Sequence, residues 1–298
     1  MHKRSYPFFL ALLTLLMACE EDLPFDDYPE AETRNVANFD ALRIKGDVTI
    51  FLNSDSIAGG PGDLIIRSDD PTPGDGLEVN SDGNTLRINA RNSALGRDRL
   101  LLFLYPSDLT SVVVEGNSQV RLLPYMSLSD LSLKTEGDSD LEVYSLCVER
   151  LETKREGNSH MLLSSALDTV NATLGLDSAT VLNVQPYQDQ VVIWTDTDIF
   201  YADSAYGGAP GELVLTGPLV QYCLVASHTL RNEGGGEVTA FAMPTLHTEV
   251  KNEGTAQAEV SVWDELVLKG EGSSTLRYRG RPTLDTRLEG GAQLIDAN

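Results

Sequence analysis

A short motif recurs along this chain at intervals near twenty residues, and this periodicity constrains the fold more than any other feature. The clearest copies are Glu115-Gly116-Asn117-Ser118, Glu136-Gly137-Asp138-Ser139 and Glu156-Gly157-Asn158-Ser159, with looser copies at Glu233-Gly234, Glu253-Gly254, Glu271-Gly272 and Glu289-Gly290. A repeat of this length indicates one structural unit that is stacked many times.

The residues around each glycine of this motif alternate between apolar and polar side chains. Positions an even number of residues from the glycine are mostly apolar, and odd positions are mostly polar. The even class four residues before the glycine consists of Val112, Leu133, Thr153, Leu230, Val250, Leu268 and Thr286. The odd class includes Lys134, Lys154, Lys251, Lys269 and Arg277. A period of two predicts strands with one buried face on both sides of a tight turn.

The repeat predicts an all-β fold, a parallel β-helix (β-solenoid) of about ten rungs with irregular N-terminal strands. In each rung the glycine would supply the positive φ that a corner requires. The alternative is a sandwich of antiparallel hairpins, but turns of the Asn-Gly type are absent between copies. The interval from Gly157 to Gly234 spans about four repeats, so three degenerate copies are expected within it, near Leu176-Asp177-Ser178, near Thr197-Asp198 and near Gly217.

Composition and periodicity divide the chain into segments with different roles. Residues 1–18 are expected to be a signal peptide, residues 19–35 an acidic tether, residues 36–108 an N-terminal β region and cap, and residues 109–298 the β-helix repeats. The repeat pattern still holds at Leu294 and Ile295, close to the end of the chain. The last rung is therefore expected to need a cover, either a loop or another protomer, and a homo-oligomer through the C-terminal rung is one expectation.

The first residues have the form of a bacterial export signal. A basic start at Lys3 and Arg4 precedes an apolar stretch that ends in Leu16-Met17-Ala18-Cys19. This tetrad resembles the lipobox of bacterial lipoproteins, and the resemblance implies that Cys19 is acylated, with palmitate among its acyl chains. An ordinary secretory signal or an uncleaved anchor is the alternative. The acidic residues after Cys19 resemble a surface-export signal, so we expect an outer membrane lipoprotein that is exposed on the cell surface and held to the membrane by its lipid anchor.

Charge and cysteine content narrow the possible partners. The formal net charge of −23 argues against a nucleic-acid partner, because phosphate binding depends on Lys and Arg. Apart from Cys19, the chain contains Cys147 and Cys223. With a rise of ~4.8 Å per rung, these two would lie roughly 19 Å apart, beyond the ~7 Å that a disulfide spans. Two free, buried thiols are therefore predicted.

The polar corners of the repeat raise the question of a metal site. Stacked copies would align Asn117, Asp138, Asn158 and Asp177 into a ladder, whose side chains would satisfy the backbone of the turns. Calcium binding is the alternative, since this ion prefers hard oxygen ligands. Neutral Asn alternates with Asp and no bidentate Glu is placed beside them, so we expect no metal site and no cofactor.

Two further segments resemble a known family. Arg277-Tyr278-Arg279-Gly280-Arg281-Pro282, followed by Leu288-Glu289-Gly290-Gly291, resembles the Y-x-G-x-P…G-x-G ending of the head GIN domain of auto-transporter adhesins, and residues 39–48 resemble its opening strand. The resemblance extends over residues 36–298 and implies a β-helical cell-envelope protein with no established enzymatic role. The chain departs from the family pattern at residues 176–232, where Pro186, Pro210 and Pro218 intrude.

The preferred functional interpretation is a non-enzymatic cell-surface adhesin or a module that binds glycans or proteins. Guanidinium groups gathered at one end of an acidic chain could bind glycan carboxylates through bidentate hydrogen bonds. The alternative is that these arginines neutralise neighbouring acids such as Asp285 and Glu289. The expected ligand-binding residues are Arg277, Tyr278, Arg279, Arg281 and Arg287.

Two other function classes stay open. A polysaccharide-active enzyme on a β-helix would need paired carboxylates, or a carboxylate and a base, in a cleft. His160, His228 and His247 are scattered along the chain, and His228 falls at an inward position where a structural role is expected, so we expect no enzyme. A structural envelope assembly protein could instead use the open rung as an edge that pairs with a partner.

Overall fold

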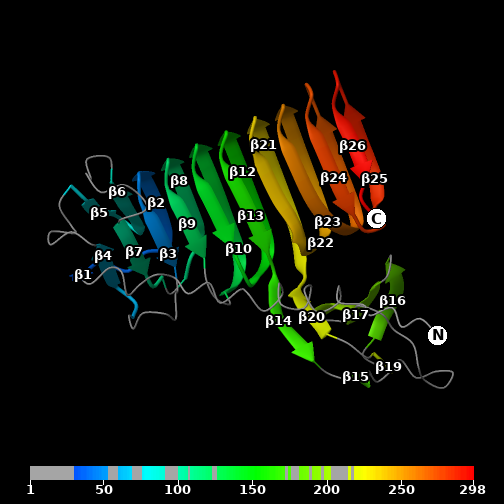
Figure 1. Ribbon diagram of the computed structural model, residues 1–298, viewed down its shortest axis with the longest axis horizontal. Helices are drawn as coiled ribbons and strands as arrows, with labels where there is room; N and C mark the ends of the chain where they lie inside the picture. The colour runs from blue at the N-terminus through cyan, green and yellow to red at the C-terminus, as the bar shows by residue number, and fades with distance from the viewer. Residues whose placement is uncertain are drawn as a thin grey trace, which may run out of the picture.

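The computed structural model describes residues 30–52, 60–68, 76–90, 100–106, 108–122, 126–171, 174–175, 181–187, 190–195, 198–202, 214–215 and 218–298. Within these ranges every regular element is a β-strand (Figure 1). In the same ranges, no helix has the length and apolar character needed to cross a membrane. The all-β prediction is therefore confirmed for this part of the chain.

Two runs of parallel strands make up most of a 19-stranded sheet. The first run consists, in spatial order, of β6 (Thr85–Asn89), β2 (Ala41–Gly46), β8 (Ser111–Gly116), β10 (Met126–Gly137), β12 (Leu146–Gly157), β21 (Val225–Gly234), β22 (Glu237–Gly254), β23 (Gln257–Gly270) and β25 (Thr283–Leu288). In Figure 1 these strands progress from the blue and cyan end of the molecule to the red end.

The second run lies on the other side of the glycine turns. It consists of β7 (Leu100–Leu104), β3 (Thr49–Leu52), β9 (Gln119–Leu122), β11 (Asp140–Val143), β13 (His160–Ser164), the first part of β22, the first part of β23, β24 (Thr275–Arg279) and β26 (Gln293–Asp296). The long strands β22 and β23 belong to both runs because each begins in the second run and ends in the first.

Equivalent residues of successive copies lie beside one another in both runs. In the first run Leu133 pairs with Thr153, and in the second run Leu141 pairs with Met161. All four side chains are fully buried, and residues from both runs belong to one hydrophobic core. The predicted alternation is therefore confirmed, and because consecutive copies pair in parallel, the antiparallel-hairpin alternative is wrong. The sheet as a whole is mostly parallel and is not closed.

The glycine at each corner is required by the close approach of successive copies. Gly157 and Gly234 have φ values of 84° and 99°, which favour glycine over residues with a Cβ atom. A Cβ atom on Gly234 would also lie 2.7 Å from the carbonyl oxygen of Gly157. The recurrent glycine of the sequence thus marks positions where backbone stacks directly on backbone.

The N-terminal strands cover the far end of the two runs in antiparallel fashion. In the second run, β4 (Asp63–Ser68) pairs with β7, and β1 (Glu30–Asn35) pairs with β4. In the first run, β5 (Glu78–Asp82) pairs with β6. At this end, therefore, strands of opposite direction lie against the parallel strands.

The prediction of three degenerate copies between Gly157 and Gly234 is wrong. Strand β12 pairs directly with β21, and Gly157 lies opposite Gly234, so no copy separates them in the stack. The intervening chain contains a separate antiparallel sheet of β14 (Ala166–Asn171), β20 (Pro218–Cys223), β18 (Asp198–Ala202), β17 (Gln190–Thr195) and β16 (Val181–Tyr187), and a small pair of β15 (Leu174–Gly175) and β19 (Val214–Leu215). The expected corners at residues 176–178, 197 and 217 lie outside the described residues.

The same insertion overturns the prediction of two free thiols. Because β21 stacks directly on β12, the two cysteines are brought together, with a Cα–Cα distance of 5.3 Å, and they form the disulfide Cys147–Cys223. The backbone closes the insertion at the same place, since the amide of Cys223 donates to the carbonyl of Ser165 at 3.0 Å. The disulfide therefore ties the base of the inserted sheet to the parallel stack.

Candidate functional site

Two of the predicted arginines meet an aromatic ring near the C-terminal end of the second run. Arg277 and Arg279 both extend from β24, on the face that points away from the core. Their guanidinium carbons lie 5.6 Å and 4.2 Å from the ring centroid of Phe241, which belongs to β22. Both distances are within the range of cation–π attraction. The ring therefore forms a platform beneath two cationic groups.

The arginines of this basic cluster, defined as Arg277, Arg279 and Arg281, differ in their acidic partners. Arg277 forms an ion pair with Glu259, the residue that lies opposite it on β23. Among the described residues no carboxylate pairs with Arg279, and the Nε of that side chain is buried without a hydrogen-bond partner. Arg281 is exposed and likewise has no partner in that part of the chain. Two guanidinium groups are thus left without a neutralising acid.

The other two predicted ligand-binding residues lie elsewhere. Tyr278 points into the core and is 9% exposed, and its hydroxyl donates to Asp296. Burial and the nearby Asp296 carboxylate raise the pKa of Tyr278. Arg287 belongs to β25 in the first run, where it pairs with Glu289 at 2.6 Å. The structure therefore brings Arg277 and Arg279 together but separates them from Tyr278 and Arg287.

A ladder of alternating charges follows the first run beside the glycine turns. At five corners the glutamate before the glycine pairs with a basic residue two positions earlier, as in Lys251–Glu253 at 2.7 Å and Lys269–Glu271 at 3.0 Å. The same arrangement joins Lys134 to Glu136, Lys154 to Glu156 and Arg287 to Glu289. The Lys154 ammonium holds the pKa of Glu156 below its usual value, and the Lys269 ammonium does the same for Glu271. Within each pair the positive and the negative charge neutralise each other.

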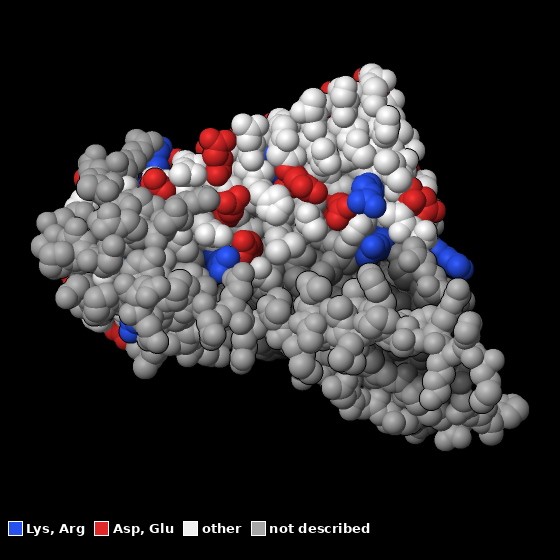
Figure 2. All heavy atoms as spheres, viewed as in Figure 1, with Lys and Arg blue, Asp and Glu red and all other residues white. Residues whose placement is uncertain are grey.

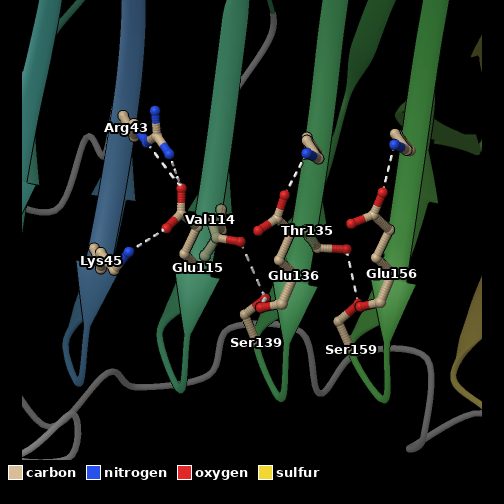
Figure 3. A network of polar contacts seen from close by, with 11 residues as sticks. Arg43, Lys45, Val114, Glu115, Thr135, Glu136, Ser139, Glu156 and Ser159 are labelled. Atoms are coloured by element: carbon tan, nitrogen blue, oxygen red, sulfur yellow. Dashed lines mark hydrogen bonds and ion pairs between the residues drawn. The ribbon is translucent and has the colours of Figure 1, made fainter. Parts of the chain in front are cut away.

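Glu115 departs from this pattern because Val113, which has no charge, stands two positions before it, and the Glu115 side chain is nearly buried. Its Oε1 accepts from the Nε of Arg43 at 2.8 Å, and its Oε2 lies 2.9 Å from the Nζ of Lys45 (Figure 3). Both basic residues come from β2, the neighbouring strand. A shallow groove of about 460 Å³ runs over this part of the ladder, lined by Lys45, Gly46, Asp47, Glu115, Gly116, Glu136 and Gly137.

Serine side chains lie buried on the inner side of the same turns. Ser139 donates to the carbonyl of Glu136 at 3.1 Å, and Ser159 donates to the carbonyl of Glu156 at the same distance. Thr135 and Ser159 share a hydrogen bond of 2.9 Å between adjacent copies (Figure 3). The recurrent serine of the motif therefore holds the corner backbone, a structural role.

The exposed Asn and Asp residues at the corners bond to one another. Asn117 donates to Asp47 at 3.3 Å, and Asn158 donates to Asp138 at 3.4 Å. Among the described residues no group of three or more His, Cys, Asp and Glu side chains is arranged to hold a metal ion. Asp177 lies outside the described residues.

A buried polar cluster occupies the place where the insertion interrupts the repeat. Arg155 is fully buried, and its guanidinium donates to Asn232 Oδ1, to the carbonyl of Gly157 at 2.6 Å and to the carbonyl of Glu233. Burial lowers the pKa of Arg155 to about 10. Asn232 continues the cluster by donating to Asn252 at 2.9 Å. Sequence reasoning missed this cluster, although Arg155 stands at an even, inward position of the repeat.

The histidines do not gather in a cleft. His228 is buried, shares a hydrogen bond of 2.8 Å with Thr153, and has its pKa lowered to about 4 by burial. His247 is half-exposed and lies 3.7 Å from Asp264 and 3.9 Å from Glu265, beyond hydrogen-bond distance. A second groove, of about 440 Å³, is bordered by the ion pair of Arg150 with Asp130 and contains no histidine.

On the face seen in Figure 2, Lys and Arg are interspersed with Asp and Glu across the middle of the described surface, whereas its upper-right part is largely uncharged. The negative net charge is thus distributed rather than gathered in one patch on this face. Cys19, the predicted lipidation site, lies outside the described residues.

Comparison with solved structures identifies proteins of the same fold. The chain is similar to the crystal structure of a "putative adhesin" from Bacteroides fragilis NCTC 9343, with a TM-score of 0.60, 14% identity, and coverage of 90% of this chain and 96% of that one. For a "putative adhesin" from Parabacteroides distasonis ATCC 8503, the TM-score is 0.55 and the identity is 14%, with coverage of 90% of this chain and 96% of that one. For a "Putative lipid binding protein" from the same organism, the TM-score is 0.55 and the identity is 13%, with coverage of 91% of this chain and 97% of that one. No family model matches the chain, and no curated protein matches its sequence.

Proposed function

We propose that this chain is a non-enzymatic lipoprotein of the bacterial cell surface, an adhesin-type module that binds acidic glycans through the basic cluster. The observation that carries the proposal is the pair of guanidinium groups, Arg279 and Arg281, that have no acidic partner among the described residues. In a chain with a net charge of −23, acidic side chains are abundant, so basic groups without an acidic partner are unexpected unless they serve to bind something else. An anionic ligand would account for them.

The chemistry of the cluster fits a carboxylate- or sulfate-bearing sugar. A guanidinium group donates two parallel hydrogen bonds to a carboxylate, which gives orientation as well as affinity. Arg279 is held over the ring of Phe241, so less of its side-chain freedom is lost on binding. Arg277 is held in place by Glu259 and can rearrange to share a ligand oxygen.

The architecture supports presentation of such a site to a large ligand. We infer a parallel β-solenoid of the head GIN type, whose copies are those that pair in register from β6 and β7 to β25 and β26. Stacked repeats give a long, stiff surface that suits extended polymers. The likeness to the two solved structures described as adhesins supports the same class of function.

Export from the cytoplasm is supported by an independent observation. The disulfide Cys147–Cys223 belongs to a class of bond that persists in oxidising compartments, which include the periplasm and the cell surface. Together with the lipobox-like tetrad that ends at Cys19, it favours a protein tethered outside the inner membrane. Replacement of Cys19 by Ala should abolish the incorporation of labelled palmitate into the protein, whereas equal labelling of that variant would contradict acylation at Cys19.

The glycan-binding proposal is tested with acidic and neutral polysaccharides. Calorimetry with polygalacturonate, dextran sulfate and neutral dextran should give binding of one or both acidic polymers and none of the neutral one. The double variant Arg279→Ala, Arg281→Ala should weaken that binding at least ten-fold. Increasing salt should weaken it as well, because the contacts are between exposed charges.

A matched control distinguishes loss of the basic cluster from a general loss of positive charge. The double variant Arg87→Ala, Arg150→Ala removes the same number of positive charges from residues that are paired with Asp82 and Asp130. We expect it to bind like the unmodified protein. Equal loss in both double variants, or unchanged binding after removal of Arg279 and Arg281, would count against the basic cluster.

A further inference from the structure

The last copy of the repeat ends in two strands that have a neighbour on one side only. Among the described residues β25 pairs with β23 alone, and β26 pairs with β24 alone. Every residue of β25 is exposed. These strands form the red end of the sheet in Figure 1. A free edge of this kind offers unpaired backbone groups to another strand.

At the opposite end of the stack, antiparallel strands pair with the outermost parallel strands. There β5 lies against β6, and β4 and β1 lie beyond β7, all in antiparallel pairing. Within the described part of the chain, the C-terminal edge is therefore the end at which the parallel runs stop without such a cover.

Apolar side chains are exposed at this edge. Leu284 and Leu288 of β25 are 44% and 43% exposed. The residue opposite Leu284 on β23 is Leu266, which is fully buried. Leu284 thus continues a core column, and it is exposed because that column ends there.

Within β25, residues 284–288 are symmetric in chemical character about Thr286. Leu284 and Leu288 stand two residues to either side of Thr286, and the oppositely charged Asp285 and Arg287 stand one residue to either side. We infer that β25 pairs antiparallel with β25 of a second copy of this chain, about a two-fold axis at Thr286. This proposal concerns the assembly of the protein and is independent of the glycan site.

The two-fold arrangement gives contacts to the side chains on both faces of β25. Leu284 would lie opposite Leu288 of the second copy, which covers the end of the core column. Asp285 would lie opposite Arg287 of the second copy, and each contact would occur twice, as in every two-fold interface. Within its own chain Asp285 makes no ion pair with any described residue. The second run can continue across the same junction, because β26 ends at the same edge.

The self-complementary pattern favours a second copy over an unrelated protein. Directly opposed residues of an antiparallel pair contribute most when they are both apolar or oppositely charged. The register centred on Thr286 meets that condition at Leu284 with Leu288 and at Asp285 with Arg287. An unrelated strand would have to supply the same pattern independently.

Disulfide trapping tests the register directly. In the full chain, purified in mild detergent, Thr286→Cys places the new thiol beside its equivalent in the second copy, and mild oxidation should give a covalent dimer in most molecules. Thr283→Cys on the same strand is the control, because antiparallel pairing places the two copies of that residue far apart. Absence of the Thr286 dimer, or equal trapping at both positions, would overturn the proposal.

A charge exchange tests the pairing without a new thiol. Arg287→Asp places like charges opposite each other, so sedimentation should show at least a ten-fold rise in the dimer dissociation constant. The double variant Asp285→Arg, Arg287→Asp restores opposite charges and should recover most of the dimer. A monomer at every concentration of the parent protein, or a double variant no better than the single one, would contradict self-pairing through β25.

Discussion

Arg155 and Asn232 are 77 residues apart in the chain, and the Nε of Arg155 donates a hydrogen bond to Asn232 Oδ1 in the buried core. The contact crosses the boundary between β12 and β21, where the insertion leaves and re-enters the stack. A buried guanidinium is unusual in a repeat whose inward positions are otherwise mostly apolar or small and polar. Its carbonyl and amide acceptors come from both sides of the boundary, so it joins the two halves of the stack.

Removal of this guanidinium should destabilise the protein. Arg155→Met leaves Asn232 Oδ1 and the carbonyl of Glu233 without their donor, and we expect a loss of about 2–4 kcal/mol in the free energy of unfolding. Urea denaturation measures the loss. Lys154→Met, at the neighbouring outward position of the same strand, should change stability by less than about 1 kcal/mol. A loss of similar size in both variants would contradict a bridging role for Arg155.

The glycine that faces Arg155 should be intolerant of any side chain. A Cβ atom on Gly236 would lie 2.1 Å from the carbonyl oxygen of Ser159 and 2.3 Å from Nη1 of Arg155. We expect Gly236→Ala to cost about 2–4 kcal/mol, because backbone cannot move aside there. At Gly235 the nearest atom is a side-chain oxygen of Asn158 at 3.2 Å. Gly235→Ala should therefore be close to neutral in the same urea titration, and equal losses would argue against the clash.

His228 should make stability depend on pH in the mildly acidic range. Burial lowers its pKa from 6.5 to about 4. Between these values the unfolded chain binds more protons than the folded protein, so the free energy of unfolding falls as the pH drops from about 6.5 to about 4, by up to roughly 3 kcal/mol. Urea midpoints at pH 7 and pH 4.5 measure this change. A His228→Gln variant should show a smaller change than the parent, and an identical pH profile in the two proteins would refute the assignment.

The disulfide should contribute to stability by restricting the unfolded chain. The bond joins residues 76 positions apart, and closure of a loop of that length corresponds to about 4.5 kcal/mol. A Cys147→Ser, Cys223→Ser variant should lose this amount, and addition of a reductant should lower the urea midpoint of the parent protein only. Thiol titration provides the chemical check, since the folded parent should show no reaction at Cys147 or Cys223 before reduction.

Much of the repeat could be predicted because its physical causes are local. An alternation with a period of two fixes which side chains enter the core, and a glycine with positive φ fixes each corner. Both signals are visible at Leu133 and Gly137 without knowledge of any distant contact. The parallel pairing followed from the constant register of these positions between copies.

The insertion could not be found in the same way. The interval between Gly157 and Gly234 happens to be close to a multiple of the repeat length, so periodicity alone favoured further copies. Which strands pair across the interval depends on tertiary contacts that no local pattern encodes. The signals that could have revealed it were Arg155 at an inward position and the two cysteines, of which Cys147 precedes the interval and Cys223 lies near its end.

The basic cluster was predicted only in part. Outward parity correctly placed Arg277 and Arg279 on one face. The parity of Tyr278 is inward, which removes it from that face, and Arg287 belongs to the other run. Phe241 was missed because it lies two copies away from Arg279 in the stack and next to an irregular register between Ala240 and Pro244.

The closed base of the inserted sheet has an evolutionary consequence. The chain departs at Ser165 and returns at Cys223, and these two residues are joined by a backbone hydrogen bond, with the disulfide beside them. Everything between these points can lengthen, shorten or diverge while the scaffold on either side keeps its register. Under selection to alter the exposed surface, the inserted sheet could therefore be replaced while the parallel stack is retained.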